Sequence, residues 1–177
     1  MADKMTPEQR HRCMSHIRGR DTKPELVVRR WLWHQGFRYR LYVKSLPGRP
    51  DIVMKKWHTA IFVNGCFWHG HDCRSQRPTT NAEFWRDKIT RNRQRDDRNQ
   101  SLLQAMGWNV IVIWECQLSR KRQQQTLRTL DLALSRIVLQ HMAPQPKPYQ
   151  TGDDDIAAAA EGSVSYHRLT PPNNERK

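Results

Sequence analysis

Metal-binding and aromatic side chains are concentrated in one ten-residue segment of this chain, NGCFWHGHDC at residues 64–73. The segment holds two cysteines and two histidines around an adjacent Phe-Trp pair. Thiolates and imidazoles at this density are typical ligands of a zinc ion. Aromatic side chains on a glycine-flanked loop are poor core elements, and in a basic protein they favour stacking against nucleic-acid bases. The segment therefore predicts a metal site next to a nucleic-acid contact.

Four residues of the chain could form a tetrahedral zinc site. Cys66, His71 and Cys73 follow the pattern C-x4-H-x-C, and Cys116 follows an apolar run later in the chain. Because both segments come directly after expected strands, neighbouring strand ends could bring them together, and three thiolates with one imidazole complete a structural zinc site. The alternative is a set of buried free thiols beside a surface histidine. Cys13 has no metal-like neighbour and is interpreted as a spare thiol.

Asp51, Glu25 and His69 could carry acid–base or Mg²⁺ chemistry. Asp51 opens an expected strand after a turn, close to the end of the next strand at Val63, where a carboxylate and a backbone carbonyl can hold Mg²⁺. Asp after Pro is also an ordinary turn former. Glu25 can close a helix capping box or act near a metal. His69 could be a general acid or base, or it could replace His71 as a zinc ligand.

Helix-start signals and apolar periodicity predict the elements that position these groups. The expected helices cover about residues 6–19, 22–36, 82–106 and 124–141. The expected strands cover residues 37–43, 51–54, 59–63 and 108–114. This order predicts an α/β fold, a single domain with a mixed central sheet flanked by helices.

Length and composition predict one folded domain and a tail. A chain of 177 residues can bury one core, which we assign to residues 1–140. Residues 141–177 contain several prolines, three consecutive aspartates and a four-alanine run. Such a composition cannot bury enough apolar surface to fold, so the tail is expected to be disordered.

The charge of the chain points to a polyanionic partner. The formal net charge is +14, and the basic excess lies in residues 1–140, because residues 141–177 hold five acidic and four basic side chains. Such an excess favours DNA or RNA over a merely solvated basic surface. No apolar run approaches the ~20 residues of a membrane span, and no secretory signal opens the chain. The expected compartment is the bacterial cytoplasm, where thiols stay reduced.

Several strings together resemble one enzyme family. LPGRPD at residues 46–51 and VNGCFWHGHDC at 63–73 are the longest, and shorter matches lie at residues 13–14, 21–25, 83–85 and 112–116. They resemble the very-short-patch-repair endonucleases, the Vsr family, over about residues 5–120. The resemblance implies a restriction-endonuclease-like fold with structural zinc. It also implies a Mg²⁺-dependent nick 5′ of the thymine in T·G mismatches that arise from 5-methylcytosine deamination.

The resemblance also implies catalytic roles. Asp51 would bind Mg²⁺ together with the main-chain carbonyl of Val63, and Glu25 would hold a water on the metal. His69 would activate the attacking water or protonate the leaving group. Asn64 stands where the best-known family pattern has histidine. Asparagine can hydrogen-bond a phosphate or water but cannot transfer a proton near neutral pH, so His69 would act alone and nicking would be retained but slower.

Further family roles concern zinc and DNA. The four zinc candidates named above would be the ligands of that metal. Phe67 and Trp68 would wedge into the duplex beside the mismatch from the major groove, and Met14 would approach from the minor groove. Lys88 and Asn92 match base-reading positions, and their i, i+4 spacing places them on one helix face.

Two other functions remain open from the sequence. One is a zinc-stabilised mismatch-binding or DNA-binding module with weak or lost nuclease activity. The other is a related nicking endonuclease of different sequence context. Mismatch-repair proteins are partners expected from the family alone, and a monomer suffices for a one-strand nick.

Overall fold

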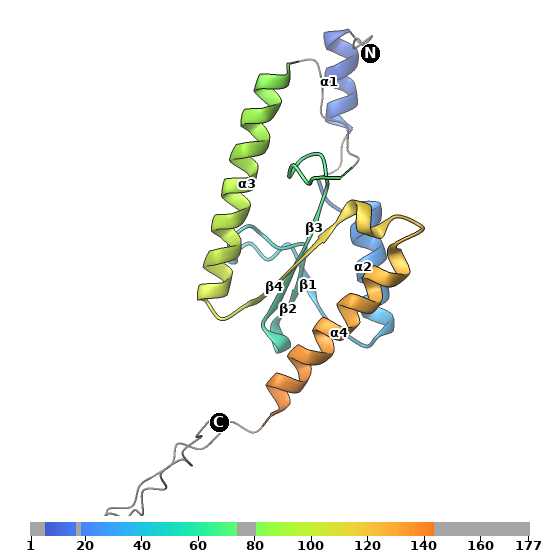
Figure 1. Cartoon of the computed structure of the whole chain (residues 1–177), viewed down its shortest axis with the longest axis vertical. Helices are drawn as coiled ribbons and strands as arrows, with labels where there is room; N and C mark the ends of the chain where they lie inside the picture. The colour runs from blue at the N-terminus through green and yellow to red at the C-terminus, as the bar shows by residue number, and fades with distance from the viewer. Residues whose placement is uncertain (1–5, 17–18, 74–80, 144–177) are drawn as a thin grey trace, which may run out of the picture. The chain divides into compact units, whose positions relative to one another are not determined.

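The computed structural model describes residues 6–16, 19–73 and 81–143, all within one unit of residues 1–143 (Figure 1). The α-helices of this part are α1 (Pro7–Ser15), α2 (Lys23–His34), α3 (Ala82–Ala105) and α4 (Gln123–Met142). The strands are β1 (Arg40–Leu41), β2 (Ile52–Met54), β3 (Thr59–Asn64) and β4 (Asn109–Trp114). Two short 3₁₀ helices are η1 (Lys55–Trp57) and η2 (Glu115–Leu118). From position 144 onward, the expected tail lies outside the described residues.

The four strands form a mixed sheet in the order β1-β2-β3-β4. β1 pairs with β2 and β2 with β3 in antiparallel fashion, whereas β3 and β4 run parallel. In the parallel pair, Val63 lies opposite Ile113 and Asn64 lies opposite Trp114. Because parallel strands end at the same edge of a sheet, the loop after β3 and η2 after β4 start side by side. The prediction of an α/β fold with a mixed central sheet is confirmed.

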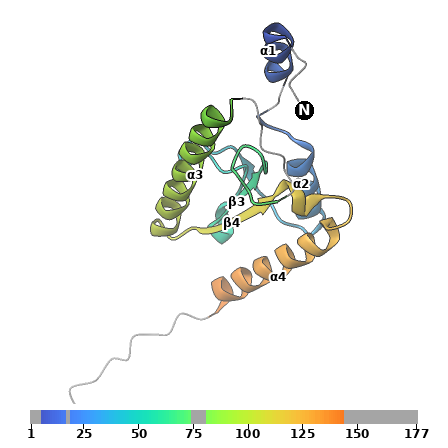
Figure 2. The same cartoon turned by 45° about the horizontal axis from the view of Figure 1, so that its top comes forward.

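Helices cover both faces of this sheet (Figures 1 and 2). Side chains alternate across a strand, so neighbouring positions of β2 and β3 face opposite layers. Ile52 and Ile61 belong to the larger core cluster, which includes the buried apolar residues of α2 and α4. Val53 and Ala60 belong to the smaller cluster, to which α3 contributes Leu103. α3 is thus held on the face opposite to α2 and α4.

The first two helices begin as their sequences predict. The Thr6 N–H donates to Gln9 Oε1 over 3.0 Å, and the Gln9 N–H donates to Thr6 Oγ1 over 3.3 Å, which completes the expected capping box of α1. Thr22 caps α2 by accepting a hydrogen bond of 3.5 Å from the Glu25 N–H. The Glu25 carboxylate, which was expected to close a capping box, accepts hydrogen bonds from the Asp21 N–H and the Thr22 hydroxyl.

The expected strand over residues 37–43 is wrong in its extent, because β1 comprises only Arg40 and Leu41. Tyr42 adopts a left-handed backbone conformation with φ of 49°, which cannot continue a strand. Alternation of apolar residues therefore overstated this strand. None of the described helices is long and apolar enough to cross a membrane.

Candidate active site and metal centre

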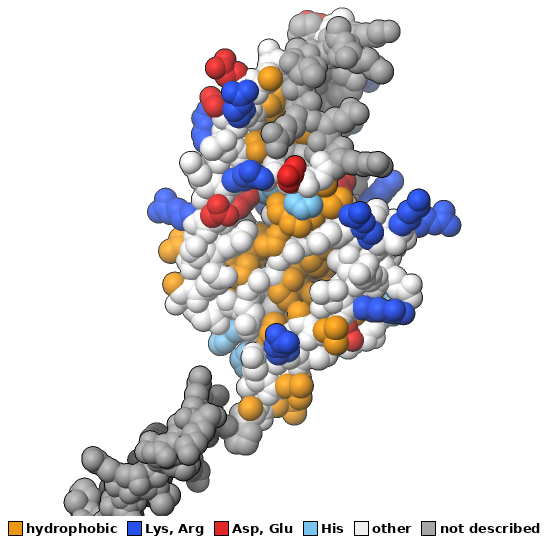
Figure 3. Space-filling view, in the orientation of Figure 1, with side chains coloured by type: hydrophobic (Ala, Val, Ile, Leu, Met, Phe, Trp, Pro, Cys, Tyr) orange, Lys and Arg blue, Asp and Glu red, His pale blue; other side chains and the backbone are white. Residues whose placement is uncertain are grey.

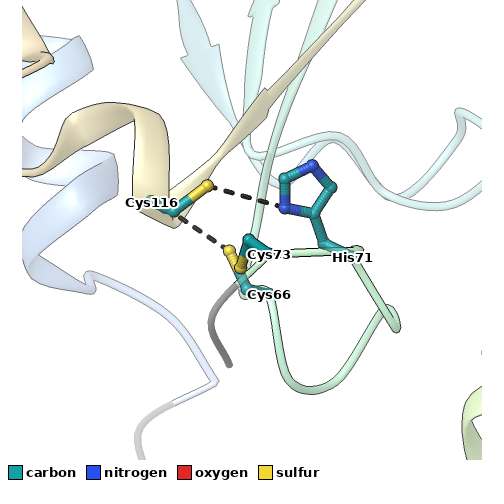
Figure 4. A group of neighbouring side chains, drawn as sticks. All are labelled: Cys66, His71, Cys73 and Cys116. Atoms are coloured by element: carbon teal, nitrogen blue, oxygen red, sulfur yellow. Dashed lines mark hydrogen bonds between the residues drawn. The ribbon is translucent and has the colours of Figure 1, made fainter. Parts of the chain in front are cut away.

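The structure brings the four predicted zinc ligands together at the shared end of β3 and β4 (Figure 4). The ligand atoms of Cys66, His71, Cys73 and Cys116 all lie within 4.8 Å of one another. The Cys116 N–H donates to Cys66 Sγ over 3.4 Å, and Cys116 Sγ lies 3.5 Å from His71 Nδ1. Three sulfur donors and one imidazole form a soft set that suits a tetrahedral zinc ion. The donor chemistry and spacing therefore fit one metal ion.

Two further observations, on Cys66 and on Trp114 beside His71, bear on metal binding by this cluster. Burial raises the pKa of the Cys66 thiol to about 12, so without a positive charge nearby it remains a neutral thiol. The Trp114 ring stacks on the His71 imidazole, with ring centroids 4.2 Å apart and an angle of 13° between the planes. Trp114 is the last residue of β4, and the sequence assigned it only to the end of an expected strand, so its stacking on His71 was not predicted.

His69 lies outside this cluster and pairs with a residue of α3. His69 Nδ1 is hydrogen-bonded to the Asp96 carboxylate, and the two side chains are only 23% and 18% exposed. The structure thus places His71 rather than His69 among the four clustered ligands. Sequence reasoning missed Asp96. The available signal was its i, i+4 spacing from Asn92, which places both residues on one face of α3.

The four predicted catalytic residues line one pocket of about 780 Å³. Glu25 enters it from α2, Asp51 from the turn before β2, Asn64 from the end of β3 and His69 from the loop that follows. The pocket also contains side chains that sequence reasoning did not single out, namely Arg49, Arg95, Asp96, Asn99, Gln100 and Glu115.

Asp51 places a carboxylate oxygen beside the backbone of Val63 in this pocket. Its Oδ2 accepts a hydrogen bond of 2.8 Å from the Val63 N–H. Because the N–H and C=O of one strand residue point to the same side, the Val63 carbonyl also faces the side of Asp51. Burial raises the pKa of Asp51 to about 6; the Val63 hydrogen bond lowers it, and the charge of Glu25 adds to the rise. A carboxylate and a carbonyl are the oxygen ligands that Mg²⁺ takes.

This burial leads to a prediction about stability. The folded-state pKa of Asp51 lies above its ordinary value. The ionised carboxylate therefore destabilises the folded state above about pH 6, whereas below about pH 4 the carboxyl is protonated and does not. In Mg²⁺-free buffer, Asp51→Asn is expected to raise the free energy of unfolding by ~2 kcal/mol at pH 8. At pH 4 the difference should vanish. Urea unfolding of both proteins at the two pH values measures this, and a destabilised variant at pH 8 would contradict the prediction.

Asn64 is buried and lines the same pocket. Within the described part of the chain, its side-chain amide makes no hydrogen bond. The amide is therefore available to a ligand of the pocket as donor or acceptor.

The aromatic residues of the loop belong to a cluster that continues onto α3. Phe67 and Trp68 meet edge to face at 5.0 Å, and the Trp85 ring lies 5.1 Å from Phe67 and 5.9 Å from Trp68. The Lys88 ammonium lies 5.3 Å from the Trp85 ring centroid and 5.7 Å from that of Trp68. Cations at this distance from aromatic faces are attracted to them. Phe84, which is 57% exposed, extends the cluster to the surface.

Contacts with α3 hold the loop in place. The Asn92 side-chain amide donates to the Trp68 carbonyl over 2.9 Å, so this predicted base-reading residue also supports the loop. Arg93 donates to the carbonyls of His69 and Gly70. Gly70 has φ of 62°, and a Cβ atom there would lie 2.4 Å from Ile89 Cγ2, so only glycine permits this approach.

The remaining predicted contact is Met14, which lies in α1; its side chain is outside the described part of the structure. On the face drawn in Figure 3, Lys and Arg side chains project around a central apolar region. This distribution agrees with the basic composition of the chain.

Comparisons with known proteins agree on one family. The family model described as DNA mismatch endonuclease Vsr matches residues 2–75. The type II nicking enzyme V.NmeAIP of Neisseria meningitidis is 46% identical over 122 residues, which cover 68% of this chain and 87% of that enzyme. The type II nicking enzyme V.XorIIP of Xanthomonas oryzae is 47% identical over 120 residues, with 67% and 88% covered. The DNA mismatch endonuclease Vsr of Escherichia coli is 43% identical over 127 residues, with 71% and 81% covered.

Proposed function

Because the chain belongs to the Vsr family of DNA mismatch endonucleases, and is thus a DNA endonuclease, we propose that it nicks duplex DNA 5′ of the thymine in T·G mismatches in a Mg²⁺-dependent reaction. Such mismatches arise when 5-methylcytosine deaminates. The observation that carries the proposal is one pocket that combines Asp51, Glu25 and the His69–Asp96 pair beside an aromatic cluster. We also propose that residues 1–140 form a restriction-endonuclease-like domain.

The proposed metal site consists of the Asp51 carboxylate and the Val63 carbonyl. When bound there, Mg²⁺ would supply Lewis-acid stabilisation of the negative charge that develops on the phosphodiester. Asp51 contributes the negative charge, and the Val63 N–H fixes the orientation of its carboxylate. Both donors are oxygen atoms, which agrees with the preference of Mg²⁺.

His69 would perform the proton transfer. A neutral imidazole that donates its Nδ1–H to the Asp96 carboxylate carries its free lone pair on Nε2. Nε2 can then take a proton from water or return one to the leaving oxygen. Asn64 would hydrogen-bond a phosphate oxygen or a water, since it cannot exchange a proton near neutral pH.

The aromatic loop would recognise the distorted duplex. We propose that Phe67 and Trp68 enter the base stack, where a mismatched step costs less to open than a paired one. Lys88 and Asn92 would contact base edges from the adjacent face of α3, and Met14 would approach from α1. The proposed zinc ion on the cysteine–histidine cluster would keep this loop rigid.

The pairing of His69 with Asp96 leads to a prediction. Asp96→Asn is expected to lower the nicking rate about 10- to 100-fold, because the amide no longer holds the imidazole in one tautomer. Binding of mismatched DNA should not change. Single-turnover rates across pH 6–9 measure the effect, and Asp97→Asn, an exposed neighbour on α3, is the matched control. A variant with the wild-type rate and pH profile would remove Asp96 from the mechanism.

The proposed function is tested with end-labelled duplexes that carry a T·G, an A·C or a fully paired centre. In Mg²⁺ the protein is expected to nick the thymine strand of the T·G duplex and to leave the other two duplexes intact. Binding to the T·G duplex without cleavage would favour the DNA-binding module instead.

A second candidate function concerns the surrounding sequence. Two of the relatives reported above are named type II nicking enzymes, which favours a nicking endonuclease of a different sequence context. A library of T·G duplexes with randomised flanking bases tests which sequence context the enzyme requires. Nicking in one narrow context identifies the bases read.

A further inference from the structure

Glu25 is a buried carboxylate in the wall of the proposed active site. It is 3% exposed, and its ion-pair partner Arg29 is 5% exposed. Its Oε2 accepts three hydrogen bonds, from the Asp21 N–H at 3.1 Å, from Arg29 Nη2 at 2.5 Å and from the Tyr42 hydroxyl at 2.6 Å. Its Oε1 accepts one, from the Thr22 hydroxyl at 2.9 Å. The two oxygens of this carboxylate are therefore used unequally.

The Tyr42 hydroxyl is fully engaged at the centre of this network. It accepts hydrogen bonds from the Asp21 N–H at 2.8 Å and from Arg29 Nη2 at 2.5 Å. A phenol has one proton to donate, and of the two carboxylate oxygens within reach Glu25 Oε2 at 2.6 Å is much closer than Asp21 Oδ1 at 3.5 Å, so the proton goes to Glu25. The hydroxyl thus points to the nearer carboxylate oxygen, that of Glu25.

The backbone of Tyr42 is strained in a way that serves this contact. Its φ of 49° is uncommon for an aromatic residue. Such a conformation persists only where surrounding contacts over-determine it, and strained residues gather at functional sites. The Arg29 guanidinium lies over the Tyr42 ring at 5.2 Å, which adds a second contact between the same two side chains. The turn after β1 is therefore shaped to bring the hydroxyl to α2.

Arg29 completes the network with its planar fork. Its Nη1 donates to Asp21 Oδ1 at 2.5 Å while Nη2 serves Glu25 and Tyr42. Burial opposes the charge of Arg29, but hydrogen bonds with Asp21 and Tyr42 keep the pKa of the guanidinium above its ordinary value. Its charge offsets that of Glu25, which otherwise disfavours ionised Asp51 in the same pocket.

We infer that Tyr42 and Arg29 are positioning residues that occupy Glu25 Oε2 and leave Oε1 to receive a hydrogen bond from a water in the pocket. The inference rests on the proposed function and on the role that the family resemblance implies for Glu25, which is to hold a water on the Mg²⁺ ion. In addition to that role, Oε1 is the Glu25 oxygen that contacts the water, and Tyr42 and Arg29 are the side chains that leave it available.

The test is Tyr42→Phe, which removes only the hydroxyl. Nicking of the T·G duplex is expected to slow about 10-fold, with a similar loss of Mg²⁺ affinity in calorimetric titration with MgCl₂. Duplex binding should be unchanged. Tyr39→Phe is the matched control, because the Tyr39 hydroxyl donates to the Arg29 carbonyl at 3.1 Å and does not touch Glu25. This control should keep wild-type rate and Mg²⁺ affinity.

A double variant shows whether Tyr42 acts through Glu25. If it does, Tyr42→Phe slows the wild-type enzyme but adds no further loss to Glu25→Gln. Independent losses that multiply in the double variant would overturn the inference. Arg29→Lys should resemble Tyr42→Phe, because an ammonium cannot reproduce the fork that reaches Asp21 and Glu25 together. Wild-type behaviour of either single variant would also overturn it.

The outcomes separate this inference from the proposed function. If the wild type nicks T·G duplexes and Tyr42→Phe does so equally well, the inference fails and the proposed function stands. If the wild type does not nick, the Mg²⁺ titration still decides. Equal Mg²⁺ affinities for wild type and Tyr42→Phe then overturn the inference, as does the absence of Mg²⁺ binding by the wild type.

Discussion

Asp51→Ala is expected to lower the nicking rate by about 10³-fold or more while mismatch binding persists. Metal stabilisation of a developing phosphoryl charge contributes several kcal/mol, and each 1.36 kcal/mol is about tenfold in rate. Asp51 is the carboxylate that the Val63 N–H orients in the pocket, so its loss removes the charged Mg²⁺ ligand. Single-turnover nicking of a T·G duplex at saturating protein measures the effect, with a mobility-shift assay for binding.

A matched control and a Mg²⁺ titration sharpen this result. Asp131 is exposed on α4, and Asp131→Ala should nick at the wild-type rate. Raising the Mg²⁺ concentration should not rescue Asp51→Ala, because the variant lacks the charged side chain that binds Mg²⁺. If Asp51→Ala nicks as well as the wild type, the assigned metal site is wrong. If Asp51→Ala loses nicking and Asp51→Asn is more stable than the wild type, Asp51 supports activity while it lowers the stability of the fold.

Cys116→Ser is expected to abolish zinc binding and to lower the melting temperature by ~10 °C or more. The thiolate comes from η2 and the other three ligands from the loop after β3, so a zinc ion would join two segments about fifty residues apart. Binding free energy at such a site adds directly to folding free energy. Zinc analysis of the purified protein and thermal unfolding with and without a chelator measure both effects.

The chain offers a cysteine control for this experiment. Cys13, interpreted from the sequence as a spare thiol, should be replaceable by serine without loss of zinc. If the wild-type protein contains no metal and the chelator does not change its melting temperature, the alternative of buried free thiols is favoured. Loss of zinc in Cys116→Ser with normal nicking would show that the rigid loop is dispensable for recognition.

Much of the secondary structure follows from local signals in the sequence. The capping box at Thr6 and the cap at Thr22 place two helix starts correctly, because these hydrogen bonds join residues three positions apart. Apolar periodicity places α3, β4 and α4 to within a few residues. The same signal failed at residues 37–43, because Tyr42 leaves the strand conformation for contacts with α2 that lie far away in sequence.

The candidate site was likewise predictable only in part. The sequence by itself determined which side chains could bind metal, transfer protons or stack on bases, since those abilities belong to residue types and short spacings. The sequence also predicted that Cys116 joins the other three zinc candidates, whereas the partner of His69 was decided by tertiary structure alone. The parallel register of β3 and β4 brings Cys116 to Cys66, and the packing of α3 on the sheet brings Asp96 to His69 across 27 positions. These contacts depend on helix rotation and strand register, which the buried core sets for the chain as a whole and no local pattern encodes.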